Sequence, residues 1–182
     1  MYKLFVTGAI GSGKTYFSNY ISRKTGVPVT SLDEIFFDLK SKELRKEQDS
    51  KIRDEILLNT TKDDYSIYEG WHFGNWLIPM YKILDAVIIV DTLLDERILR
   101  INKRFENRKM GHEIDPYPSA GTDHLNNLIK WTKLWDEKKV LDEIRLFSKN
   151  ELKLFNISDV EQIDAVLLEN LPNKAMHWSR PL

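Results

Sequence analysis

The chain has 182 residues and a net charge of −1, with 27 lysine and arginine residues against 28 aspartate and glutamate residues. A chain of this length, 42% hydrophobic and 30% charged, is expected to fold as one globular domain with its own core. It contains no cysteine, which excludes disulfides, thiolate catalysis and cysteine-based zinc sites, and its balanced charge argues against a nucleic-acid partner.

The apolar segments are short. The chain enters its first predicted strand at Tyr2 without a charged and apolar leader, and the longest apolar run, Ala86–Val90, has the length of a strand. We therefore expect no secretory signal, no membrane partner and a cytoplasmic location.

The first predicted elements are a strand and a helix joined by a glycine-rich loop. Tyr2–Thr7 is rich in β-branched and aromatic residues, which favours a buried strand. Tyr16 to Lys24 carries apolar residues at helical spacing. The residues between them fit the pattern G-x-x-x-x-G-K-[ST] of a phosphate-binding P-loop. They are Gly8, Ala9, Ile10, Gly11, Ser12, Gly13, Lys14 and Thr15.

The chemistry of this loop suits a polyphosphate. Its glycines allow close approach of backbone N–H groups, and the start of a helix attracts anions. Lys14 would place a positive charge near the β and γ phosphates, and the Thr15 hydroxyl would bind Mg²⁺. Tyr16, the next residue, is also counted among the nucleotide-binding residues. The alternative is a glycine-rich turn with a surface lysine, but the strand before it and the helix after it favour the P-loop.

The rest of the chain alternates between strands and helices. A short acidic and aromatic segment, Ser31 to Asp38, follows the second strand, and Pro79 is expected to interrupt an apolar helix. Residues 110–121 are predicted to form a loop. The predicted strands are Val27–Thr30, Tyr65–Gly70, Ala86–Asp91 and Leu152–Ile157, and the predicted helices are 41–59, Trp76–Leu84, 94–107 (with Ile98, Leu99, Ile101 and Phe105 facing inward), 122–147 and 160–171.

This alternation predicts an α/β fold around a parallel sheet. Ligands of such sheets bind at the carboxyl ends of the strands. Four predicted strand ends carry polar or aromatic residues, so one cleft is expected to contain Thr7, Ser31 to Asp33, Glu69 to Trp71 and Asp91.

Residues 1–108 resemble the small P-loop kinases of the adenylate-kinase-like superfamily, and most nearly its topology-modulation-protein-like branch. The likeness rests on the P-loop, Gly26-Val27-Pro28-Val29 followed by Leu32-Asp33, Tyr68-Glu69-Gly70, and Ala86–Asp91 followed by an arginine-rich helix.

The resemblance implies a three-layer P-loop fold, with a central five-stranded parallel sheet and helices on both faces. It also implies ATP and Mg²⁺ as the phosphoryl donor. Residues 1–171 would form one kinase domain, with an acceptor-binding helical region at 34–62 and an arginine-bearing lid at 104–121, and residues 172–182 would be a C-terminal tail.

Three residues at predicted strand ends are candidates for the acceptor and metal sites. Asp33 would orient an acceptor hydroxyl or take its proton, or else cap a helix. Glu69 would hold Mg²⁺ or bind the acceptor, or else simply end a strand. Trp71 would offer a flat wall to a base or sugar ring, or else serve in packing. Asp91 would be a metal-site carboxylate or a plain strand-end cap, and the second interpretation is favoured.

The arginines after the fourth strand recur at spacings of three and four. At least one of Arg100, Arg104 and Arg108 is expected to neutralise charge on the transferring phosphoryl group, although charged helices are often only solvated. No metal-ligand partner stands at useful spacing from His112 or His124, so neither is assigned a role.

One departure concerns the acceptor. In nucleoside monophosphate kinases an arginine closely follows the second strand and holds the acceptor phosphate. Phe36 and Phe37 occupy that neighbourhood here, and Arg45 and Arg53 come later. This departure argues against a monophosphate acceptor.

The sequence therefore predicts an ATP-dependent kinase that phosphorylates a small hydroxyl- or phosphate-bearing acceptor, such as a nucleoside, a nucleotide or a related metabolite. The alternative is a nucleotide-binding switch, an ATPase or GTPase that acts through a protein partner. The GTP-specific version usually carries an N-K-x-D motif, and Asn102 to Phe105 lacks the aspartate. A DNA-binding role ranks third, because no basic tract is present.

Overall fold

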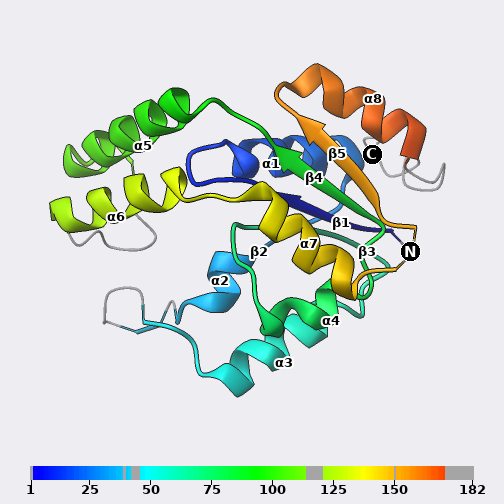
Figure 1. The fold of residues 1–182 in the computed structure, drawn as a ribbon. Helices are drawn as coiled ribbons and strands as arrows, with labels where there is room; N and C mark the ends of the chain where they lie inside the picture. The colour runs from blue at the N-terminus through cyan, green and yellow to red at the C-terminus, as the bar shows by residue number, and fades with distance from the viewer. Residues whose placement is uncertain (1, 39, 42–45, 114–120, 150, 171–182) are drawn as a thin grey trace, which may run out of the picture.

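The protein is built on one five-stranded parallel sheet (Figure 1). The computed structural model describes residues 2–38, 40–41, 46–113, 121–149 and 151–170. The strands lie in the order β2-β3-β1-β4-β5, and every neighbouring pair is parallel. This arrangement confirms the predicted fold class. The strands are β1 (Tyr2–Thr7), β2 (Val29–Ser31), β3 (Tyr65–Glu69), β4 (Ala86–Val90) and β5 (Lys153–Ile157).

Helices cover both faces of the sheet, because the central strands bury side chains on both sides. Leu4 and Val6 of β1 belong to one hydrophobic cluster, and Phe5 between them belongs to the other. The first cluster lies under α1 (Lys14–Thr25) and α8 (Val160–Asn170). The second lies under α2 (Leu32–Phe36), α3 (Ser50–Thr60), α4 (Ile78–Tyr81) and α7 (Glu137–Phe147).

A pair of helices extends from the carboxyl-end side of the sheet. α5 (Leu94–Lys109) follows β4, and α6 (Gly121–Lys133) packs beside it (Figure 1). Residues 114–120 of the predicted lid lie outside the described residues, as does the predicted tail 172–182. Among the described helices, none is long and apolar enough to cross a membrane, and the cytoplasmic location stays a prediction.

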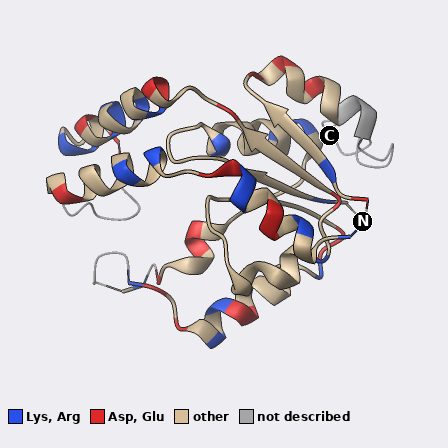
Figure 2. Ribbon diagram, in the orientation of Figure 1, with Lys and Arg blue, Asp and Glu red and all other residues tan. Residues whose placement is uncertain are grey.

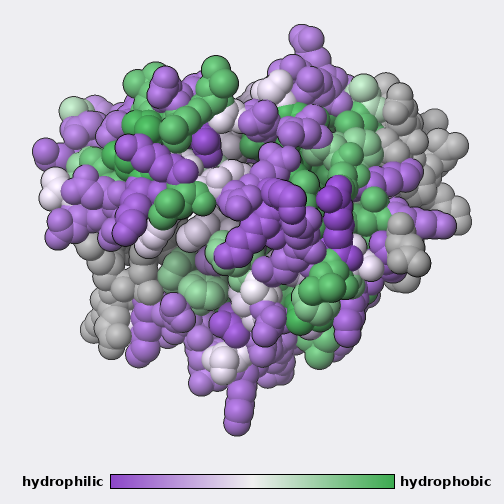
Figure 3. Space-filling view, viewed as in Figure 1, coloured by the Kyte–Doolittle hydropathy of each residue, from purple (hydrophilic) through white to green (hydrophobic). Residues whose placement is uncertain are grey.

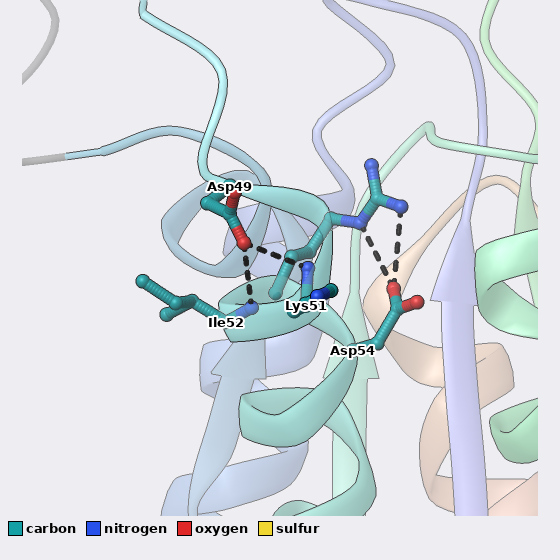
Figure 4. Close-up of polar contacts among 5 residues, drawn as sticks. Asp49, Lys51, Ile52 and Asp54 are labelled. Atoms are coloured by element: carbon teal, nitrogen blue, oxygen red, sulfur yellow. Dashed lines mark hydrogen bonds and ion pairs between the residues drawn. The ribbon is translucent and has the colours of Figure 1, made fainter.

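The predicted helix 41–59 is wrong in the described residues before Ser50, which are 41 and 46–49. Helix α3 begins only at Ser50, because the Asp49 carboxylate accepts hydrogen bonds from the backbone N–H groups of Lys51 and Ile52 (Figure 4). Before it, an isolated antiparallel bridge pairs Phe37 with Glu47. Residues 42–45 lie outside the described part of the chain.

The predicted long helix 122–147 is two helices. α6 ends at Lys133 and α7 begins at Glu137, because the Asp136 carboxylate caps α7 by accepting from the Lys139 N–H at 3.0 Å. The break lets α6 follow α5 while α7 packs on the sheet.

Two smaller expectations also need correction. Pro79 does not interrupt a helix but lies in the first turn of α4, where its missing N–H costs little, after a 3₁₀ turn over Asn75–Leu77. Leu99, expected to face inward, is 66% exposed, and hydrophobic residues lie at the surface over α5 (Figure 3).

Candidate functional site

The glycine loop between β1 and α1 has the backbone conformation that glycine alone adopts easily. Gly11 has φ +83° and Gly13, the N-cap residue of α1, has φ +98°. A Cβ atom at Gly11 would lie 2.7 Å from the carbonyl oxygen of Arg97 on α5. The loop therefore needs glycine both for its turn and for its close contact with α5.

Three side chains hold the loop by its carbonyl groups. The Thr132 hydroxyl donates to the Ile10 carbonyl at 2.6 Å, and the Thr92 hydroxyl donates to the Ser12 carbonyl at 2.9 Å. Arg100 Nη1 also donates to the Ser12 carbonyl, at 2.9 Å. The first N–H groups of a helix have no acceptor within it, so the start of α1 can offer its amides to an anion.

A cavity of about 540 Å³ opens beside the loop at the carboxyl ends of the strands. Its wall combines residues of the P-loop, α2, the end of β3, α5 and α6. It contains the predicted site residues Ile10, Gly11, Lys14, Thr15, Asp33, Glu69, Trp71, Arg100, Arg104 and Arg108. The other predicted loop residues do not line it: Gly8, Ala9 and Ser12 are buried, Gly13 lies against Arg100, and Tyr16 is 57% exposed.

A buried carboxylate faces the P-loop lysine. Glu69 Oε1 lies 4.0 Å from Lys14 Nζ, and both side chains are almost fully buried. Burial raises the pKa of Glu69, while the charge of Lys14 and a hydrogen bond with Thr15 act in the opposite direction. The Thr15 hydroxyl and the Glu69 carboxylate are hard oxygen ligands, and such ligands fit Mg²⁺.

Asp33 forms a short contact with a histidine that the sequence did not single out. Asp33 Oδ1 lies 2.6 Å from His72 Nε2. The His72 ring is buried and stacked on Phe36, with ring centroids 4.5 Å apart. Asp33 lies inside the first turn of α2 and Ser31 is the N-cap residue, so the alternative of Asp33 as an N-cap is wrong. His72 directly follows Trp71, after the end of β3, and that position was its only signal in the sequence.

Three of the four arginines of α5 are predicted site residues, and their contacts differ. Arg100 contacts the P-loop and pairs with Glu96 at 2.5 Å. Arg104 and Arg108 both pair with Glu113, at 3.7 Å and 3.5 Å. All three line the cavity, so their predicted charge-neutralising role stays a prediction that the geometry permits.

Trp71 is an aromatic residue of the cavity wall. Trp71 stacks on Trp131 of α6, with ring centroids 5.7 Å apart and planes 24° from parallel. It also lines a second pocket of about 150 Å³ with Phe73 and Trp135. His124, to which the sequence assigned no role, is buried in the cavity wall beside Leu128, one helical turn further along α6, whereas His112 is exposed.

Two solved structures are similar to this chain over most of its length. An unliganded sugar kinase from Janibacter sp. HTCC2649 is 14% identical, with a TM-score of 0.51, and the match covers 92% of this chain and 93% of that one. Shikimate kinase from Acinetobacter baumannii in complex with shikimate is 16% identical, with a TM-score of 0.52, covering 94% and 96%. The sequence matches no protein-family model, and no curated protein matches it significantly. The similarity confirms the resemblance at the level of the fold: the chain has the fold of the small P-loop kinases.

Proposed function

We propose that this protein is a kinase that transfers the γ-phosphoryl group of ATP to a hydroxyl group of a small acceptor. The observation that carries the proposal is the shared cavity. It brings the P-loop residues Lys14 and Thr15 together with two carboxylates, Asp33 and Glu69, and with arginines of α5.

The donor would lie on the P-loop. The amides at the start of α1 and the Lys14 ammonium would bind the β and γ phosphates. Thr15 and Glu69 would hold Mg²⁺, which supplies charge neutralisation to the phosphates when it is bound. Arg100, which donates a hydrogen bond to the Ser12 carbonyl of the loop, would stabilise negative charge near the transferring group.

The acceptor would lie between α2 and the end of β3. Its hydroxyl oxygen attacks the γ phosphorus, the bond from that phosphorus to the β–γ bridging oxygen breaks, and ADP leaves. Asp33 orients the hydroxyl and accepts its proton, while His72 holds the carboxylate in place from behind.

The test is a transfer assay with γ-labelled ATP and Mg²⁺ against nucleosides, nucleoside monophosphates, sugars and hydroxylated metabolites. We expect a labelled product, with transfer reduced more than about a hundredfold in Lys14→Ala. Lys51→Ala, which changes an exposed lysine of α3, is the control and should leave transfer unchanged.

Two results would contradict the proposal. Transfer that persists undiminished in Lys14→Ala would place the active site elsewhere. Tight nucleotide binding without transfer to any acceptor would favour the switch.

A further inference from the structure

Most charged residues of the 540 Å³ cavity are grouped by sign. The P-loop and α5 contribute Lys14, Arg100, Arg104 and Arg108, and Glu113 lines the wall as a partner of Arg104 and Arg108. A second, acidic side, formed by α2 and the end of β3, contributes Asp33, Glu34 and Glu69, of which Glu69 meets Lys14 at 4.0 Å. Figure 2 shows acidic residues on α2, and both basic and acidic residues along α5 and α6. In the part of the wall that the structure describes, this acidic side contains no lysine or arginine.

Arg53 is one of the two arginines that come later in the chain than the family's acceptor-binding arginine, and the other, Arg45, lies outside the described residues. The Arg53 guanidinium group donates to the Asp54 carboxylate at 3.2 Å through both Nε and Nη2 (Figure 4). The same group lies 5.0 Å from the centre of the Trp76 ring and 5.8 Å from that of Phe36. Arg53 is not part of the cavity wall. It therefore packs behind the aromatic residues instead of facing the acceptor.

The acidic side also carries flat apolar surface. Phe37 and Trp71 line the cavity there, beside Asp33 and Glu34. Rings between carboxylates suit a ligand with an apolar ring face and with hydroxyl or ammonium groups at its edge.

From this segregation, and resting on the proposed function, we infer that the acceptor is a hydroxylated ring compound that is uncharged or carries a protonated amine. Phosphorylated and carboxylated analogues are rejected. An anion on this side would face Asp33 and Glu34, and repulsion by like charge is a means of discrimination between ligands. We expect one added negative charge to weaken binding by about tenfold or more.

The first experiment measures binding, which does not depend on turnover. Calorimetry in the presence of saturating ADP and Mg²⁺ measures the dissociation constant of each probe. Cytidine is compared with cytidine 5′-monophosphate, and glucosamine and glucose are compared with glucuronate. Shikimate is a further anionic probe. At least one uncharged or cationic probe should bind at least about tenfold more tightly than its anionic counterpart. Equal or tighter binding of the anions would overturn the inference, and so would a failure of every uncharged and cationic probe to bind.

The second experiment changes the charge of the acidic side. Glu34 is exposed and lies one residue after Asp33, so Glu34→Lys should shift the binding ratio of each pair about tenfold toward the anion. Glu55→Lys makes the same change on α3, away from the cavity, and should leave the ratio unchanged. An unchanged ratio in Glu34→Lys would contradict the inference.

Transfer assays with the same compounds separate the two proposals. Efficient phosphorylation of the anionic members would overturn the inference and leave the kinase proposal standing. A clear binding preference for the uncharged or cationic members, without transfer to any compound, would support the inference for this side of the cavity and contradict the kinase proposal.

Discussion

The contact between His72 and Asp33 yields a sharp prediction, because its two components can be removed separately. His72→Phe keeps a ring that can stack on Phe36 but removes the hydrogen bond to Asp33. His72→Gln removes the ring but keeps an N–H donor that can reach the carboxylate. If His72 positions Asp33 for the acceptor, the phenylalanine variant should be the more damaged of the two.

The size of the effect follows from the surroundings of the pair. A hydrogen bond to a charged group contributes about 1.5–3 kcal/mol. The His72 side chain is 8% exposed but that of Asp33 is 36% exposed, so water can replace part of the lost interaction. We therefore take the lower end, about 1.5 kcal/mol, which corresponds to roughly tenfold in rate.

The assay is steady-state transfer from ATP to an acceptor found in the screen. We expect kcat to fall about tenfold in His72→Phe and to stay within about threefold in His72→Gln, with the KM for ATP unchanged in both. Thermal unfolding of each variant serves as the control for folding. Equal losses in the two variants would mean that the ring matters only for packing, and an unchanged kcat in His72→Phe would refute the positioning role.

Three further predictions concern the loop, the buried carboxylate and the aromatic wall. Gly11→Ala should destabilise the protein by about 1–3 kcal/mol and abolish nucleotide binding. Gly111 is also at positive φ but lies in open space, so Gly111→Ala should reduce the stability by less and leave nucleotide binding intact. Thermal unfolding and nucleotide titration check both variants. Burial raises the pKa of Glu69 above the ordinary value of a free glutamate, so the folded chain binds this proton more tightly than the unfolded chain does. The stability that this proton contributes is present below the ordinary pKa and is lost as the pH rises through the pKa of the folded state. The melting temperature of Glu69→Gln relative to the unchanged protein, measured without Mg²⁺, should therefore increase from pH 4 to pH 7, and a pH-independent difference would contradict this. Trp71→Leu removes the stacking on Trp131 and should raise the acceptor KM severalfold with little effect on the KM for ATP, and unchanged acceptor kinetics would argue against a ligand contact.

The parts of the fold that follow local rules could be predicted from the sequence. β4 is a continuous apolar run, β1 is rich in aromatic and β-branched residues, and the P-loop between Thr7 and Tyr16 is a pattern of adjacent residues. The carboxyl ends of parallel strands share one edge, so Asp33, Glu69 and Trp71 could be placed in one cleft before their contacts were known.

The parts that depend on distant contacts could not be predicted. Asp33 and His72 are 39 residues apart in the chain, and no periodicity links them. The start of α3 was missed because a single side-chain cap, Asp49, outweighed the helix propensity of the residues before it. The break between α6 and α7 was missed for the same reason. Apolar residues continue at helical spacing across it, and the cap residue Asp136 begins a new helix there.

The hydrogen bonds that hold the P-loop from outside also bear on the entropy of nucleotide binding. Ordering a backbone residue costs about 1–2 kcal/mol, and a loop that is ordered only by its ligand subtracts that cost from affinity. Here the Thr92, Thr132 and Arg100 side chains fix the carbonyls of Ile10 and Ser12 as part of folding. The phosphates would therefore bind to a loop that is already ordered. A variant in which α6 no longer contacts the loop would bind the phosphates more weakly, although every P-loop residue is still present.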